Sequence, residues 1–217
     1  IPELDELLTL THRSSDHGMT WRPIKNDGTR DRAVSSLTFT SNSAVWYGLD
    51  KFSKRLVRTT DNGTTWSDLD TTGLATVDVP RLYVHPSDDN ILFLAGDFAR
   101  DRNYLYRSTD AGASWALVGA NRMGSNSAIA GEEFVFLDSA TVYLNVHDTY
   151  RSWCSLFISR DAGKTWKIIN QKNRLYALWS RGRELYAWDN IAKSVLAMRV
   201  GDNTWRQTGS IHATWYD

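Results

Sequence analysis

At 217 residues the chain is long enough for one domain with a full hydrophobic core. Its 25 basic and 25 acidic residues balance, which argues against a broad surface for nucleic acid or anionic membrane. The single cysteine, Cys154, excludes a disulfide framework and a cysteine metal site, and no apolar run reaches membrane-spanning length.

Apolar and polar residues alternate in short runs along the chain, as in β-strands, and helix signals are almost absent. The runs group into units at residues 1–25 (partial), 26–72, 73–120, 121–170 and 171–209. Residues 210–217 are predicted to form either a strand that completes the first, partial unit or the first strand of a further unit. In the partial unit, residues 7–13 are predicted to form one strand. The strands predicted for the complete units lie at residues 34–40, 44–49, 55–58 and 66–69; 81–84, 91–95, 104–107 and 115–118; 133–137, 141–146, 155–158 and 166–169; and 175–179, 184–188, 195–199 and 204–207.

The turn between the third and fourth strands of a unit carries the pattern Ser/Thr-x-Asp-x-Gly-x-Ser/Thr-Trp. Four copies occur at residues 14–21, 59–66, 108–115 and 159–166. A degenerate copy at residues 200–205 keeps only the Thr-Trp end of the pattern. The tryptophans follow one another at 45, 49, 51 and 39 residues (66−21, 115−66, 166−115 and 205−166). A repeat of this length suits a four-stranded propeller blade.

Each residue of the pattern has a physical role in a tight turn. The aspartate carboxylate accepts backbone N–H groups just ahead of it, and the glycine supplies a positive φ. The tryptophan buries a large ring as the chain turns back. The structural residues predicted in this way are Asp16, Gly18 and Trp21; Asp61, Gly63 and Trp66; Asp110, Gly112 and Trp115; and Asp161, Gly163 and Trp166.

The four copies resemble the Asp-box, or bacterial neuraminidase repeat, of sialidases, xyloglucanase-type glycoside hydrolases and sortilin-type receptors. The resemblance implies an all-β fold, a β-propeller of four-stranded antiparallel blades whose boxes lie away from the ligand face. It implies about five blades or a fragment of a larger propeller, and we favour the fragment. No sialidase catalytic residue carries over, because the segment from Trp21 to Ile24 does not match their Phe/Tyr-Arg-Ile-Pro motif.

The end of the chain echoes an earlier strand, since residues 211–215 resemble residues 175–179. They are predicted to form the inner strand of one more blade. That strand either closes a ring with the N-terminal strands, in a blade that lacks an evident second strand, or opens a further blade.

An aspartate ends the second strand of each complete unit: Asp50, Asp97, Asp148 and Asp189. They precede the corresponding box positions by 11, 13, 13 and 11 residues (61−50, 110−97, 161−148 and 200−189). In an up-and-down blade this connection lies on the face opposite the boxes, where propellers commonly bind ligands. Either each carboxylate satisfies backbone groups at a strand end, or the four form a rim for a cation, a basic peptide or a sugar.

Aromatic and basic residues accompany these aspartates. Rings contact the C–H faces of sugars while Asp and Arg take the hydroxyls, and a few polar groups among aromatics are a common small-ligand design. For each single ring, packing between blades is the alternative. The predicted ligand-binding residues beside the four aspartates are Trp188, Tyr104, Tyr150, Trp153, Arg102 and Arg151.

These observations predict carbohydrate recognition, by a binding module or by part of a glycoside hydrolase; the alternative is a protein-binding propeller of the sortilin kind or an assembly factor. Glycoside cleavage needs two carboxyl groups about 5–9 Å apart, for which Asp148, Glu133 and Asp97 are the candidates. The connections after the second strands are short, so we expect no turnover from this chain alone. A glycan or polysaccharide is the expected partner, with a protein as the alternative, no nucleic acid, and no metal or cofactor. The resemblance implies a secreted or extracytoplasmic protein.

Overall fold

The computed structural model describes residues 7–8, 12–14, 19–23, 25–26, 30–31, 34–72, 74, 79–97, 105–118, 127–128, 134–148, 153–170, 175–202 and 204–210. Within these residues the regular structure consists of 22 short strands and no helix, so the predicted all-β class is confirmed. A helix long and apolar enough to cross a membrane does not occur in the part of the chain that the structure describes.

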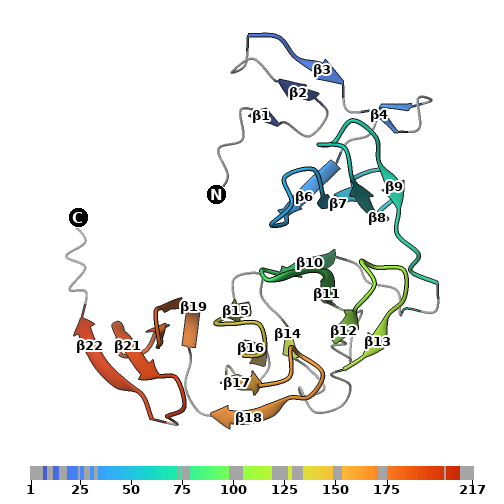
Figure 1. Ribbon diagram of the computed structural model, residues 1–217. Coiled ribbons are helices and arrows are strands. Elements are labelled where there is room, and N and C mark those ends of the chain that lie inside the picture. Colours follow the sequence, from blue (N-terminus) through green and yellow to red (C-terminus); the bar gives the residue numbers. More distant parts are fainter. Residues whose placement is uncertain are drawn as a thin grey trace. The chain divides into compact units, whose positions relative to one another are not determined.

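The strands form five sheets and one small hairpin (Figure 1). The first sheet is β1 (Leu7–Leu8), β2 (His12–Ser14) and β3 (Arg22–Pro23), followed by the hairpin β4 (Lys25–Asn26) and β5 (Arg30–Asp31). The second sheet is β6 (Val34–Phe39), β7 (Trp46–Asp50), β8 (Leu56–Thr59) and β9 (Ser67–Asp68). The third is β10 (Val79–His85), β11 (Asp88–Asp97), β12 (Leu105–Ser108) and β13 (Ala116–Leu117). The fourth is β14 (Ser127–Ala128), β15 (Phe134–Phe136), β16 (Val142–Asp148), β17 (Trp153–Ser159) and β18 (Lys167–Asn170). The fifth is β19 (Leu175–Arg181), β20 (Glu184–Asp189), β21 (Ser194–Arg199) and β22 (Arg206–Ser210).

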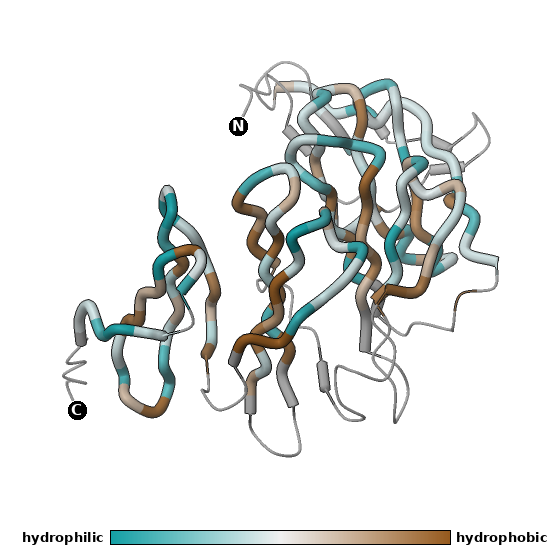
Figure 2. The backbone as a smooth tube through the Cα atoms, turned by 60° about the horizontal axis from the view of Figure 1, so that its bottom comes forward, coloured by the Kyte–Doolittle hydropathy of each residue, from teal (hydrophilic) through white to brown (hydrophobic). Residues whose placement is uncertain are grey.

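Strands that follow one another in sequence are neighbours in the second, third and fifth sheets, which gives the predicted four-stranded up-and-down order. The fourth sheet differs, because β14 and β15 both pair with β16, through Ser127↔Asp148 and Phe134↔Leu144. The short strand β14 was not predicted, since two residues carry no readable alternation. Hydrophobic residues recur in short stretches of the chain that alternate with hydrophilic ones (Figure 2).

The prediction of one strand over residues 7–13 is wrong. β1 and β2 are separate strands that pair antiparallel, with Leu7 opposite Ser14 and Leu8 opposite Arg13. Both arms of a hairpin have a side-chain period of two, so alternation alone does not reveal the turn between them. In the order of a blade, β1 therefore takes the place of the second strand, which the closing blade was expected to lack. Residues 211–217 lie outside the described residues, so their predicted strand remains a prediction.

The chain divides into two compact units. One comprises Ile1–Thr76, Pro80–Leu94 and Arg107–Ala116, and the other Val77–Val79, Ala95–Tyr106 and Leu117–Asp217. In the first unit, β7 is buried along almost its whole length, and successive side chains of a strand point to opposite faces. The second sheet is therefore covered on both faces, which its apolar residues allow. Its two clusters centre on Trp46 with Trp66, and on Tyr47 with Leu92 of β11.

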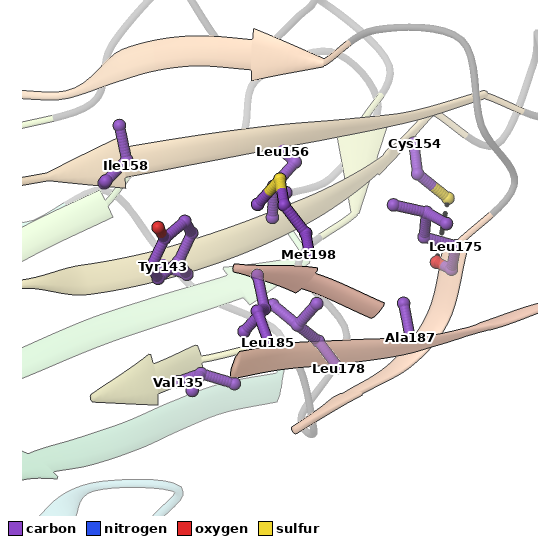
Figure 3. Close-up of a cluster of buried hydrophobic side chains, with 10 residues drawn as sticks. All are labelled: Val135, Tyr143, Cys154, Leu156, Ile158, Leu175, Leu178, Leu185, Ala187 and Met198. Carbon is purple, nitrogen blue, oxygen red and sulfur yellow. Dashed lines mark hydrogen bonds between the residues drawn. The ribbon is translucent and has the colours of Figure 1, made fainter. Parts of the chain in front are cut away.

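In the second unit the fourth and fifth sheets share one core (Figure 3). Tyr143 and Leu156 of the fourth sheet pack against Leu185 and Met198 of the fifth. Cys154 is also buried there, 2% exposed, and its thiol contacts the main-chain oxygen of Leu175 at 3.2 Å. Cys154 is therefore a small buried residue on β17.

Candidate functional site

The second box shows how the repeated motif closes its turn. Thr59 Oγ1 donates to Asp61 Oδ1 at 2.8 Å, and the backbone N–H of Thr65 donates to the same oxygen at 2.8 Å. The hydroxyl of Thr65 donates to Asp61 Oδ2 at 2.7 Å, and the N–H of Gly63 donates to Thr59 Oγ1 at 2.9 Å. The Trp66 indole N–H donates back to the carbonyl of Gly63 at 3.1 Å. The carboxylate therefore links the two ends of the turn by hydrogen bonds.

The third and fourth boxes repeat this geometry. Ser108 and Ser159 donate to Asp110 and Asp161 at 2.7 and 2.8 Å. The N–H groups of Ser114 and Thr165 donate to the same carboxylates at 2.8 and 2.9 Å. The turn prediction is confirmed for these boxes, whereas Asp16 and Gly18 of the first box lie outside the described residues.

The hydrogen bonds also hold the box carboxyl groups in their charged form. Burial alone would raise the pKa of Asp161, but the bonds from Thr165 and Ser159 outweigh it and lower the pKa to about 2. The same balance, with Thr65 and Thr59 as donors, lowers the pKa of Asp61. A carboxylate held so firmly as an acceptor is a poor general acid, so these aspartates are structural.

A second feature of the boxes is not visible in the pattern: two successive residues have positive φ. The glycine is one of them, with φ 76° at Gly63, where an added Cβ would lie 2.8 Å from Trp46. The residue before it is the other, at φ 54–56° in Asn62, Ala111 and Ala162. This left-handed turn directs the N–H of that residue at a carbonyl near the start of the second strand. The resulting bonds join Asn62 to Ala44, Ala111 to Asn90 and Ala162 to Ala140.

The box tryptophans are less uniform than predicted. Trp66 is buried at 3% exposure, but Trp115 and Trp166 are only half-buried, and Trp21 is 41% exposed. Full burial was therefore the wrong prediction for Trp115 and Trp166. A box tryptophan packs on whatever lies beside its sheet, so its burial depends on that neighbour and not on the motif.

The four predicted rim aspartates all stand at the end of a second strand, since β7, β11, β16 and β20 end at Asp50, Asp97, Asp148 and Asp189. Short connections follow in three cases, of five residues after Asp50 and of four after Asp148 and Asp189. Asp50 bonds to Arg55, Asp148 pairs with Trp153, and Asp189 pairs with Ser194.

Two of these aspartates have described side chains, and both act within their turns. Asp50 is 6% exposed, and its Oδ1 accepts the N–H groups of Phe52 and Ser53 at 2.8 and 3.2 Å. Asp189 Oδ1 accepts the N–H groups of Ile191 and Ala192 at 2.8 and 2.9 Å. The turn-capping interpretation is therefore correct for Asp50 and Asp189.

The remaining predicted site residues are described only in part. The backbones of Asp97, Asp148 and Trp153 lie in strands, but their side chains are outside the description. Trp188 is half-buried on β20, opposite Tyr176 and Val195. Four further residues and one catalytic candidate lie outside the described residues: Tyr104, Tyr150, Arg102, Arg151 and Glu133. Among the described residues no group of three His, Cys, Asp or Glu side chains is placed to hold a metal ion.

Comparison with known families decides the relationship. The Sortilin-Vps10 model, described as sortilin and neurotensin receptor 3, matches residues 10–150, and the BNR/Asp-box repeat model matches residues 157–167. The chain belongs to the Sortilin-Vps10 family. The Asp-box resemblance seen in the sequence is thereby confirmed.

Relatives of this Sortilin-Vps10 chain include glycoside hydrolases. A xyloglucanase from Paenibacillus sp is 31% identical over 209 residues, which cover 77% of this chain and 19% of that protein. The solved GH74 enzyme of Niastella koreensis matches with a TM-score of 0.59 and 20% identity, over 91% of this chain and 34% of that one. YCF48 bound to a D1 peptide matches with a TM-score of 0.59 and 16% identity, over 91% and 60%. The chain spans only 19% and 22% of the curated xyloglucanases it matches. The solved structures show the β-propeller fold.

The sequence analysis missed an aromatic pair in the fifth sheet. Trp179 of β19 stacks on Tyr186 of β20, with ring centroids 5.8 Å apart and planes 13° apart. The Tyr186 hydroxyl donates to Glu184 at 2.7 Å, and Arg206 forms an ion pair with the same carboxylate. These bonds lower the pKa of Glu184, with Tyr186 as the main cause.

The feature that identifies Tyr186 is its position relative to a hydrogen-bonded carbonyl, and not a fixed distance in sequence from the box. In each complete sheet an aromatic residue stands three places after the carbonyl that accepts the box N–H. The carbonyls are Ala44, Asn90, Ala140 and Arg183, and the aromatic residues are Tyr47, Phe93, Tyr143 and Tyr186. These aromatics precede their box positions by different numbers of residues, so a fixed spacing does not find them.

Proposed function

We propose that this chain is part of a polysaccharide-recognising propeller of the glycoside hydrolase type. The observation that carries the proposal is its 31% identity over 209 residues with a xyloglucanase. A second xyloglucanase, from Hypocrea jecorina, is 26% identical over 191 residues. Its ligand is a β-glucan of the xyloglucan kind, bound at the connections that follow the second strands.

The described connections support this location. Phe52 lies in the turn after Asp50 and is 78% exposed, so its ring is available to stack on a sugar. Ile191, 67% exposed, holds the corresponding place after Asp189. The aspartates fix these turns with Oδ1, and this keeps the tips in one conformation. Convergence of all four connections on one mouth is part of the proposal.

Binding is tested by isothermal titration with xyloglucan oligosaccharides, mixed-linkage β-glucan and sialyllactose. Phe52→Ala should weaken xyloglucan binding about tenfold, which corresponds to about 1.4 kcal/mol. Met19→Ala is the matched control, because Met19 is also highly exposed, at 86%, but belongs to the first box. Equal losses in the two variants, or no binding of any glucan, would refute the location or the ligand class.

The charge of the rim is tested separately from its turns. Asp50→Asn and Asp189→Asn retain an Oδ1 acceptor for the turn N–H groups while removing the negative charge. If the carboxylates contact sugar hydroxyls, these variants should lose affinity while their melting temperatures stay within about 2 °C of the parent. Unchanged affinity would assign Asp50 and Asp189 to turn capping alone.

We also propose that the 217-residue chain has no glycosidase turnover by itself. Asp50 and Asp189 are engaged by turn N–H groups, which leaves Asp97, Asp148 and Glu133 as the candidate acids. A reducing-end assay on xyloglucan and β-glucan decides the point. Turnover that disappears in Asp148→Asn or Glu133→Gln would overturn the proposal and identify the acid.

A protein-binding role of the sortilin kind is the second candidate, because the Sortilin-Vps10 model covers residues 10–150. Peptide binding that persists in Phe52→Ala, without any glucan binding, would favour it. Either role fits a protein that works outside the cytoplasm, where polymeric glycans and secreted partners are encountered; fractionation of the native host is the test.

A further inference from the structure

The second box contains a tripeptide that the turn by itself does not require. Residues 62–64 read Asn-Gly-Thr, the only place in the 217-residue sequence where asparagine, a residue other than proline, and serine or threonine follow one another. This pattern is the acceptor sequence for N-linked glycosylation, and it is used where it lies on the surface of an exported protein. Because three residues often match by chance, the structure around them has to support the interpretation.

Both polar residues of the tripeptide stand at positions that vary between boxes. The residues at the position of Asn62 in the other boxes are His17, Ala111 and Ala162, and those at the position of Thr64 are Met19, Ala113 and Lys164. In the second, third and fourth boxes the main-chain N–H groups at both positions make the same turn bonds. The turn therefore needs neither an asparagine side chain at the first position nor a hydroxyl at the second.

The backbone conformation explains the asparagine but not the threonine. Asn62 has φ 55°, and asparagine is enriched among residues with a positive φ. The Thr64 hydroxyl donates to the carbonyl of Asp61 at 2.8 Å, a bond that the third box cannot form because Ala113 stands there. The third box closes its turn without this bond. A hydroxyl two places after the asparagine is, however, what an N-glycosylating enzyme requires.

The position of Asn62 in the folded turn leaves room for a glycan. Asn62 and Thr64 are both exposed. Gly63 between them is buried, and its N–H donates to Thr59 Oγ1 at 2.9 Å. The main chain at the tip of the turn is thus held from within, and a sugar attached to Asn62 extends into solvent instead of into the core.

A glycan on the second box also avoids the connection proposed to bind polysaccharide. β7 and β8 run antiparallel, with Trp46 opposite Thr59 and Leu49 opposite Leu56. The box follows Thr59, at the end of the second sheet where β7 begins, whereas Phe52 follows β7 at the other end of the same sheet. Glycosylation of the box and binding of a ligand at Phe52 are therefore compatible.

We propose that Asn62 accepts an N-linked glycan when the chain is exported through a eukaryotic secretory pathway. The donor is an oligosaccharide linked to a lipid pyrophosphate. Nδ2 of Asn62 forms a bond to C1 of the donor's terminal sugar and loses one proton. The bond between C1 and the pyrophosphate oxygen breaks, and the lipid pyrophosphate leaves with the electron pair. The transfer acts on the chain before the turn has formed, so the contacts of the folded box do not oppose it.

Secretion of the 217-residue chain from cultured eukaryotic cells, behind a cleavable signal sequence, tests the proposal whatever ligand the propeller binds. The intact mass should exceed that of the polypeptide by one N-glycan. Peptide N-glycosidase F should remove the glycan and leave an aspartate at position 62, which peptide mapping by mass spectrometry locates.

Variants at the two ends of the tripeptide separate the acceptor from the rest of the surface. Asn62→Ala and Thr64→Ala should each abolish the added mass, and both should fold, because the third box has alanine at both positions. Thr64→Ala is the decisive variant, since it keeps the Asn62 amide and removes only the hydroxyl that the enzyme requires. Thr64→Ser restores a hydroxyl and should be glycosylated like the parent.

Three results would overturn the proposal. The first is a secreted parent protein whose mass equals that of the bare polypeptide. The second is a glycan that persists in Thr64→Ala. The third is a glycan that peptide mapping assigns to a residue other than Asn62.

Discussion

Removal of the Asp161 carboxylate should destabilise the fold by an amount that depends on pH. Burial alone would raise its pKa, but hydrogen bonds from Thr165 and Ser159 lower the pKa from 3.8 to about 2. A pKa lowered by this much corresponds to roughly 2–3 kcal/mol. Because the side chain is part-exposed and screened by solvent, we discount this to about 1–2 kcal/mol. For a chain of this length the melting temperature should fall by about 3–6 °C at pH 7.

The sign of the pH dependence follows from the lowered pKa. In the folded state Asp161 stays charged at pH values at which the same carboxyl group of the unfolded chain is already protonated. The stabilisation is therefore complete above about pH 4 and is lost as the pH falls towards 2. Asp161→Asn removes the charge and keeps an acceptor, so the difference in unfolding free energy between parent and variant should shrink over this interval.

Urea denaturation followed by tryptophan fluorescence, at pH 7, 5 and about 3, measures this difference. Asp202→Ala is the control, because Asp202 is exposed and lies in the degenerate copy of the box. A parent-to-variant difference that stays constant from pH 7 to about pH 3 would refute the role of the charged carboxylate. A loss below about 0.5 kcal/mol at pH 7 would refute the hydrogen-bond argument itself.

Other predictions follow from burial, backbone conformation and contacts between sheets. Trp66→Ala should cost about 3–5 kcal/mol in urea denaturation, because this tryptophan is 3% exposed; a cost below about 1 kcal/mol would contradict its packing role. Ala111→Gly should raise the unfolding free energy by about 0.5 kcal/mol, since alanine at φ 56° is strained and glycine is not; a loss of stability would show that the strain is absent. Asp89→Ala should cost about 1–3 kcal/mol, because its carboxylate accepts the N–H groups of Ser41 and Asn42 at 3.0 and 3.1 Å; wild-type stability in Asp89→Ala would show that this link is dispensable.

The Asp-box turns could be predicted from the sequence because their partners are close in sequence. The eight residues from Ser159 to Trp166 contain the donor hydroxyls, the accepting carboxylate and the glycine of the turn. The same holds for Asp50 and Asp189, whose carboxylates bond residues two and three places ahead. For these two aspartates the choice between turn cap and ligand rim needed coordinates, because the same residue suits both roles.

Predictions that depended on which strands pair were less successful. The alternation over residues 7–13 did not distinguish one strand from a hairpin, because only the pairing of Leu7 with Ser14 defines the turn. The strand β14 was also missed, since two residues pair with β16 without any pattern of their own.

The sequence by itself determined the box turns and the all-β class, because each is set by residues within about ten places of one another. It also determined the repeat, because the box recurs at intervals of 39 to 51 residues. The tertiary structure alone decided the environment of each aromatic ring. Trp66 and Trp21 occupy the same position of the same motif, yet one is 3% and the other 41% exposed. Tyr143 and Tyr186 share a register, yet only Tyr143 is fully buried, because the fifth sheet covers it. Burial of a ring is a property of the surface that meets it, and that surface comes from a sheet tens of residues away in the chain.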